Sequence, residues 1–117
     1  MTTNPRYVYI AGPYSKGDTM HNIRQAIVAA SMVRAAGHWP YVPHLSGLWD
    51  LVVPLPYEEW LALDSAWLRW CDVVVVLPGE SGGVRREIAL ASSLGIPVVM
   101  LAECNPMAKL HEWLQSL

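Results

Sequence analysis

The residue with the clearest chemical potential is Glu87, a carboxylic acid in the apolar stripe of a predicted helix. Glu87 lies three residues after Val84 and four before Ala91, which places it on the core side of the first helical turn. One interpretation is structural, because an acid in the first turn compensates the helix dipole. However, the cations Arg85 and Arg86 share this turn, where the dipole disfavours them unless an anion binds nearby. The pattern therefore favours a functional carboxylate.

A second acid, Asp64, lies in the middle of another apolar helical stripe. Trp60 precedes it by four residues and Leu68 follows it by four. A carboxylate on a buried helix face is costly unless it is paired or hydrogen-bonded, and a contact with a backbone amide would be a purely structural solution. An apolar setting also raises the pKa of a carboxyl group, which suits an acid that protonates a leaving group near neutral pH.

A glycine-rich turn precedes the helix that carries Glu87. Ser81, Gly82 and Gly83 have little or no side chain, so their backbone amides can approach a ligand closely. Five apolar residues, Val73 to Leu77, lead into this turn and are typical of a strand buried on both faces. Because helix N-termini attract anions, we expect an anion site here.

The elements that must position these residues alternate along the chain. Strands are predicted at 6–11, 39–42, 73–77 and 95–101, and helices begin near residues 19, 57, 84 and 106. This alternation predicts one α/β domain over residues 1–117. We expect a Rossmann-like or flavodoxin-like three-layer sandwich, with a parallel sheet of four to five strands in the order 2-1-3-4.

In that order, the crevice between the first and third strands is the expected ligand site, at their carboxyl ends. Tyr9 on the first strand and Glu87 converge there. The residues expected to bind substrate are Gly12, Tyr14, Ser15, His44, Ser81, Gly82 and Gly83. The connection from Pro43 to Pro56 is long and apolar, so we expect it to pack over a cleft or against another subunit.

Composition argues against several function classes. The 117 residues are 53% hydrophobic, with a net charge of −2 and no basic run, which disfavours a nucleic-acid polymer or a membrane as partner. Cys71 and Cys104 lack metal-ligand spacing, as do the four histidines, so neither a metal nor another cofactor is expected. Without an apolar run that could span a membrane, we expect a cytoplasmic protein.

With these residues assembled, the sequence resembles the nucleoside 2-deoxyribosyltransferase superfamily. This superfamily includes small phage and bacterial members and the 2′-deoxynucleoside 5′-monophosphate N-glycosidases. The resemblance covers nearly the whole chain. It rests on Tyr9-Ile-Ala-Gly-Pro-Tyr14, on Asp64 placed eight residues before Asp72 (72 − 64 = 8), and on Ser81-Gly-Gly-Val-Arg-Arg-Glu87.

The resemblance implies roles for individual residues. Glu87 would be the nucleophile, Asp64 would handle the proton on the base, and Tyr9 would orient the glutamate. Ser81 matches the phosphate-binding serine of the monophosphate-cleaving branch. The first loop departs from that branch, because Pro13 and Ser15-Lys16 stand where it has a serine and an arginine. The resemblance also implies that neighbouring subunits complete the site.

The expected activity is cleavage of the base–sugar bond of a (deoxy)nucleoside 5′-monophosphate through a covalent glycosyl-glutamate. Three alternatives stay open. A nucleoside 2-deoxyribosyltransferase would exchange bases between deoxynucleosides. Leu77-Pro-Gly79 followed by Gly83 and Glu87 is similar to part of the signature of cytokinin-activating phosphoribohydrolases. A non-catalytic nucleotide-binding module would use the same acids to hold ribose hydroxyls. We expect the protein to bind a nucleotide or nucleoside as a homodimer or larger oligomer.

Overall fold

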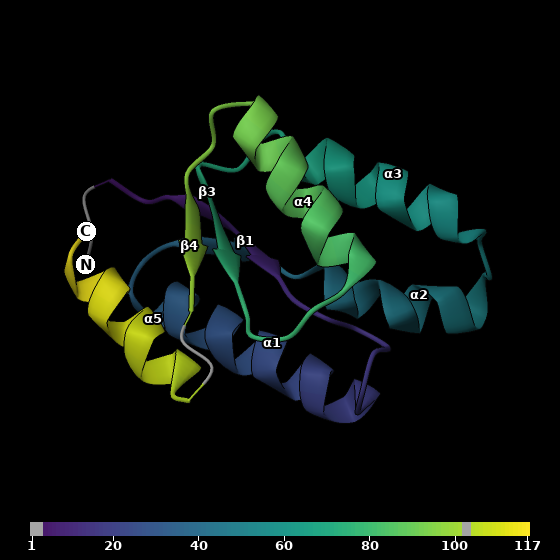
Figure 1. The fold of residues 1–117 in the computed structure, drawn as a ribbon, viewed down its shortest axis with the longest axis horizontal. Helices are drawn as coiled ribbons and strands as arrows, with labels where there is room; N and C mark the ends of the chain where they lie inside the picture. The colour runs from purple at the N-terminus through teal and green to yellow at the C-terminus, as the bar shows by residue number, and fades with distance from the viewer. Residues whose placement is uncertain (1–3, 102–103) are drawn as a thin grey trace.

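A parallel four-stranded sheet forms the centre of the computed structural model, which describes residues 4–101 and 104–117 (Figure 1). The strands are β1 (Tyr7–Ala11), β2 (Trp39–Tyr41), β3 (Val73–Val76) and β4 (Val98–Met100). They pair in the order β2-β1-β3-β4, which confirms the predicted α/β fold and strand order. β2 lies at the edge of the sheet, where a proline within a strand is tolerated.

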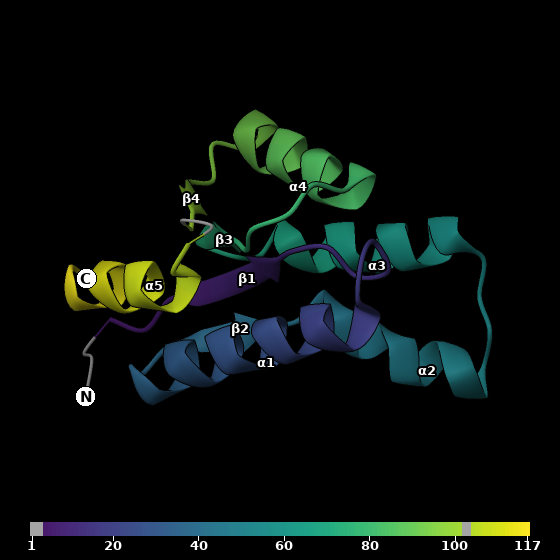
Figure 2. The same cartoon turned by 60° about the horizontal axis from the view of Figure 1, so that its bottom comes forward.

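Helices cover both faces of this sheet. In the described parts of the chain they are α1 (Thr19–Ala35), η1 (Pro43–Leu45, a 3₁₀ turn), α2 (Ser46–Val52), α3 (Tyr57–Leu68), α4 (Gly82–Ser93) and α5 (Pro106–Gln115). Figure 2 shows α1 on one side of the sheet and α3 and α4 on the other. No described helix is long and apolar enough to cross a membrane.

The residues of β1 alternate between the two layers. Val8 and Ile10 pack into the core cluster shared with α1 and α5, whereas Tyr9 and Ala11 pack into the cluster shared with α3 and α4. All four side chains are fully buried. Because side chains alternate along a strand, Tyr9 faces the layer opposite to that of Val8 and Ile10, on the side of α3 and α4.

Three of the described helices are preceded by a residue whose side chain accepts a hydrogen bond from the backbone N–H three residues later. These N-caps are Asp18 for α1, Ser81 for α4 and Asn105 for α5. Since α4 begins at Gly82, Glu87 is its sixth residue and lies in the second turn, not the first as expected from the sequence. Compensation of the helix dipole therefore does not explain Glu87.

The segment from residue 43 to 56 differs from the expected loop. Most of it is helical, as η1 and α2, followed by a short link to α3. Its apolar side chains remain outside the core: Leu48 is 69% exposed, and Leu51 and Val52 are each 81% exposed. The segment forms one side of the cleft described below and presents an apolar face to solvent.

Candidate active site

A cleft of about 580 Å³ opens at the carboxyl ends of β1 and β3. Loop 12–16, η1, α2, α3 and the start of α4 form its walls. Both acids, Glu87 and Asp64, line it. All seven of the residues expected to bind substrate line it as well: Gly12, Tyr14, Ser15, His44, Ser81, Gly82 and Gly83. Tyr9 is fully buried beneath the cleft and reaches it only through its contact with Glu87.

Glu87 enters the cleft from α4 and is held by Tyr9 from below. The Tyr9 hydroxyl donates a hydrogen bond to Oε2 of Glu87. Burial raises the pKa of Glu87 to about 7; the Tyr9 hydrogen bond opposes this rise, and the negative charge of Asp64 adds to it. Burial, followed by the charge of Glu87, raises the pKa of Tyr9 far above its usual value, so Tyr9 remains a donor. Oε1 of Glu87 is thereby left for a reacting atom.

Asp64 is held by Tyr41, which is not among the predicted site residues. The Tyr41 hydroxyl donates to Oδ1 of Asp64 at 3.1 Å. Burial raises the pKa of Asp64 to about 6, and the Tyr41 hydrogen bond opposes the rise. Asp64 is thus paired with a side chain, in place of the backbone amide considered from the sequence. The register pairs Tyr9 with Tyr41 on neighbouring strands, so an alignment of the two strands would have placed Tyr41 on the same face.

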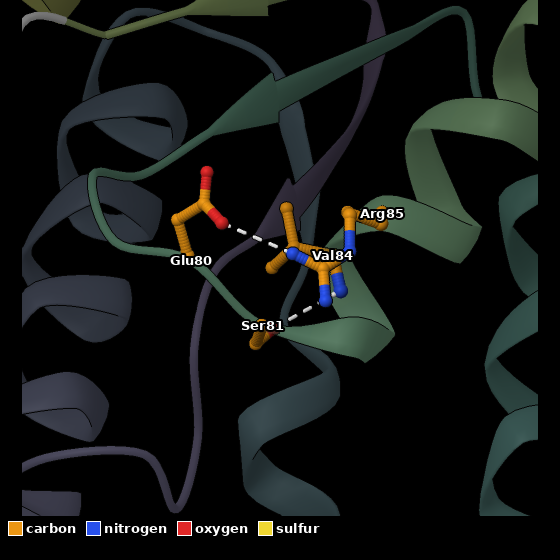
Figure 3. A network of polar contacts seen from close by, with 4 residues as sticks. All are labelled: Glu80, Ser81, Val84 and Arg85. Atoms are coloured by element: carbon orange, nitrogen blue, oxygen red, sulfur yellow. Dashed lines mark hydrogen bonds and ion pairs between the residues drawn. The ribbon is translucent and has the colours of Figure 1, made fainter.

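Ser81, Gly82 and Gly83 form the end of the cleft suited to an anion. Figure 3 shows the Ser81 hydroxyl accepting from the backbone N–H of Val84 at 3.1 Å. This contact uses an acceptor lone pair of the Ser81 oxygen, so its own O–H can still donate to a ligand. The turn is open, because a Cβ on Gly82 would meet nothing within 4 Å. A phosphate placed here would meet the N-terminus of α4.

The two arginines of α4 do not line the cleft. Arg85 forms an ion pair with Glu80 at 3.0 Å (Figure 3), and the two side chains are 67% and 83% exposed. Neither Arg85 nor Arg86 is among the described residues that line the cleft, whereas Lys16 is. Lys16 is therefore the cation that lines the cleft, and Arg85 is an exposed residue paired with Glu80.

His44 is buried in the wall opposite α4. Its Nε2 donates to the carbonyl oxygen of Pro13 at 3.0 Å, and burial lowers the pKa of the imidazole, which favours the neutral ring. Within the described structure its Nδ1 is buried without a hydrogen-bond partner. A neutral ring that donates from Nε2 carries an acceptor at Nδ1, and this buried atom is not exposed to the cleft.

Loop 12–16 is fixed by residues on two helices. Asn22 of α1 was not predicted to matter, yet its side-chain amide donates to the carbonyl oxygens of Tyr14 at 2.9 Å and Lys16 at 2.8 Å. The Tyr14 ring packs against Gly47 of α2, where a Cβ would collide with the tyrosine hydroxyl. Both contacts hold Tyr14 and Lys16 at the edge of the cleft.

An aromatic and apolar wall lies next to Asp64 on the α3 side. Trp60, Tyr57, Leu55 and Leu61 line the cleft there. Asp50 accepts from Nε1 of Trp60 at 2.8 Å and thereby fixes the indole. Flat, apolar surfaces with few polar groups suit a planar heterocycle, so this wall is where a base would bind.

The described residues contain no group of three or more His, Cys, Asp or Glu side chains that could hold a metal ion. The polar groups of the cleft include three acids, several hydroxyls, one lysine and an imidazole: Glu87, Asp64, Asp50, Ser15, Ser46, Ser81, Tyr14, Tyr57, Lys16 and His44. Such a set can supply a nucleophile, a general acid and donors to an anion.

The family described as "Domain of unknown function (DUF7768)" matches residues 6–101. The chain belongs to this family. The matched range contains Tyr9, Asp64 and Glu87, and all the strands described above. No curated protein matches the chain.

Two solved structures are similar to this member of the DUF7768 family. A conserved protein from Enterococcus faecalis V583 has a TM-score of 0.68 and 25% identity over 84% of this chain, which spans 64% of that protein. A 2-deoxyribosyltransferase from Bacillus psychrosaccharolyticus has a TM-score of 0.58 and 20% identity, covering 81% of this chain and 71% of that one. The chain therefore shares the fold of a 2-deoxyribosyltransferase.

Proposed function

We propose that this protein is an enzyme that cleaves the N-glycosidic bond of a (deoxy)nucleoside 5′-monophosphate, through a nucleoside 2-deoxyribosyltransferase-like domain over residues 1–117. The observation that carries the proposal is the pair Glu87 and Asp64. Both acids line one cleft, both have raised pKa values, and each accepts a hydrogen bond from a tyrosine. Two acids with shifted pKa values in one cleft are typical of glycosidic-bond cleavage.

In the proposed reaction, a carboxylate oxygen of Glu87 attacks the anomeric carbon of the sugar. The carbon–nitrogen bond breaks, and its electron pair leaves with the base, which takes a proton from Asp64. A covalent glycosyl-glutamate remains. Water then attacks the same carbon and gives its proton to the Asp64 carboxylate, and the Glu87 carboxylate is released. The products are the free base and the sugar 5-phosphate.

The arrangement of the cleft supports a phosphorylated substrate. The open turn at Ser81 and Lys16 offer hydroxyl, amide and ammonium donors to a phosphate, while the wall around Trp60 offers a surface for the base. In this orientation the bond to be cleaved lies between the phosphate end at Ser81 and the base wall at Trp60, near Glu87 and Asp64.

A second candidate is transfer of the deoxyribosyl group to another base. It is favoured by the fold likeness to the 2-deoxyribosyltransferase from Bacillus psychrosaccharolyticus. The first half of the reaction would be the same, with Glu87 forming the glycosyl intermediate. A second base would then replace water as the attacking group.

Chromatography of free base separates these candidates. The purified protein is incubated with a deoxynucleoside, its 5′-monophosphate and the matching ribonucleotide, each with and without a second free base. Release of base from the monophosphate alone supports the hydrolase, and a new nucleoside formed only with the second base supports the transferase. Binding without release of base from any of them contradicts both and favours a binding module.

A further inference from the structure

Tyr41 contacts Asp64 without lining the cleft. Its hydroxyl donates to Oδ1 of Asp64 at 3.1 Å, while the cleft wall is formed by other described residues. Tyr41 stands on the edge strand β2, in register with Tyr9 on β1. It therefore approaches Asp64 from behind, on the side away from a bound molecule.

Ring contacts on two sides fix the orientation of Tyr41. Its ring lies 5.4 Å from the ring of Tyr9 and 5.8 Å from that of Trp67, centroid to centroid, and it is stacked on Trp67 with an interplanar angle of 22°. Aromatic pairs at this separation are attractive. The Tyr41 hydroxyl is thus presented to Asp64 by a ring that contacts two other rings.

We propose that Tyr41 is the positioning residue for the acid of the reaction: its O–H occupies Oδ1 of Asp64, so that Oδ2 is the oxygen that carries a proton to the leaving base. An O–H has a single proton to donate, so Oδ1 accepts it and a proton taken up by Asp64 resides on Oδ2. Each tyrosine donates to a different acid: Tyr9 donates to Glu87, and Tyr41 donates to Asp64. This inference rests on the proposed function.

The surroundings of Asp64 determine which way its titration should move. Tyr41 faces it from β2, Glu87 from α4 and Tyr9 from β1, and Cys71, in the link between α3 and β3, interacts electrostatically with Tyr41. A hydrogen bond to the ionised form lowers the pKa of an acid, here against the effect of burial. Removing the Tyr41 hydroxyl should therefore raise the pKa of Asp64.

The first test is a ¹³C NMR titration of the aspartate carboxyl groups in the substrate-free protein, with Tyr41→Phe compared with wild type. Phenylalanine keeps the ring contacts and removes the O–H, and Asp64→Asn identifies the Asp64 signal. We expect an upward shift of the Asp64 pKa in Tyr41→Phe and no shift in Tyr7→Phe, which alters an exposed tyrosine on β1. An unchanged Asp64 titration in folded Tyr41→Phe overturns the proposal.

A second variant covers the case in which Tyr41→Phe does not fold. Site-specific 3-fluorotyrosine at position 41 has a more acidic O–H and is a stronger donor, so it should move the Asp64 pKa downward. An unchanged or raised pKa there overturns the proposal. Both titrations are read without substrate, so they decide the role of Tyr41 towards Asp64 even if the proposed reaction fails.

The pH dependence of turnover supplies a readout that a purely structural role would not move. Because Asp64 must be protonated, raising its pKa preserves activity on the alkaline side. The ratio of kcat/KM at about pH 8.5 to that at about pH 6 should rise in Tyr41→Phe, whatever the overall loss. An equal loss at both pH values overturns the positioning role.

Discussion

At the scale of single residues, Glu87 and Asp64 titrate close together, with pKa values of about 7 and about 6 that are raised chiefly by burial. The proposed reaction needs Glu87 ionised and Asp64 protonated. We therefore expect kcat/KM to follow a bell-shaped pH profile with limbs near these two values, belonging to the pair and not to either acid alone. Initial rates of base release between about pH 5 and pH 9 check this. A flat profile over that range would contradict the assignment.

The same shifts predict how stability depends on pH. The pKa of Glu87 rises from 4.5 to about 7 on folding, so the folded state holds more protons than the unfolded state between these values. Stability should therefore fall as pH rises through this window. Glu87→Gln has no titrating group at this position. The stability of the variant minus that of the wild type should therefore be larger at about pH 8 than at about pH 4, by up to roughly 3 kcal/mol. Denaturant unfolding at both pH values measures the difference, and equal differences would contradict the buried, titrating glutamate.

Replacing the nucleophile tests the chemistry directly. Glu87→Gln keeps the shape and the contact with Tyr9 but removes the attacking carboxylate, so base release should fall by roughly 10⁴-fold. Glu80→Gln is the matched control, because Glu80 is an exposed surface residue paired with Arg85. Near-normal release by Glu87→Gln would show that another group attacks the sugar.

At the scale of elements, the N-terminus of α4 combines a structural cap with the proposed phosphate contact. Ser81→Ala removes the cap at Val84 and should cost about 1 kcal/mol of stability. It should also lower kcat/KM for the monophosphate by roughly 5- to 150-fold without the same loss for the nucleoside.

Asn105→Ala is the control for Ser81→Ala. Asn105 caps α5 by the same kind of hydrogen bond, but it lies outside the cleft lining. It should cost similar stability and leave both substrates unaffected. If Ser81→Ala slows both substrates equally, Ser81 is only a cap.

The strands and helices that carry the site follow closely from local sequence patterns. The run Val73 to Leu77 reads as a buried strand, and all five of its side chains are buried. Helix faces are harder to predict, because the core of α1 is built from small residues. Ile27, which fits the helical period, is 43% exposed, while Ala26 and Ala29 are fully buried against the sheet. Residue size alone does not identify the buried face.

The contacts that complete the site depend on which strands become neighbours. Tyr41 reaches Asp64 only because β2 lies in register beside β1. Such contacts join residues whose patterns are independent in the sequence. The two acids can be recognised from the sequence alone, because a carboxylate in an apolar stripe is unusual whichever elements the helix packs against.

At the scale of the whole molecule, the apolar side chains of α2 are left exposed next to the cleft. Leu48 is 69% exposed, and Leu51 and Val52 are each 81% exposed. The only charged residue of α2 is Asp50, and it turns inward to bond Trp60 and the Leu55 backbone. An uncharged, apolar helix face is well suited to pack against the same face of a second copy, and so we propose a homodimer or larger oligomer.

Leu51→Arg tests this surface. It places a charge at the centre of the exposed α2 face and should reduce the mass measured by light scattering at micromolar concentration to that of a monomer. Because Leu51 contributes little to the core of one chain, thermal unfolding of the isolated subunit should change little. Met20→Arg is the matched control: Met20 is 71% exposed on α1, and its replacement should leave the mass unchanged.

If the wild type is already a monomer at this concentration, or if Leu51→Arg retains the wild-type mass, α2 does not form the interface. If dissociation by Leu51→Arg also lowers base release while Met20→Arg does not, the neighbouring copy supports the cleft, as the position of α2 in its wall suggests.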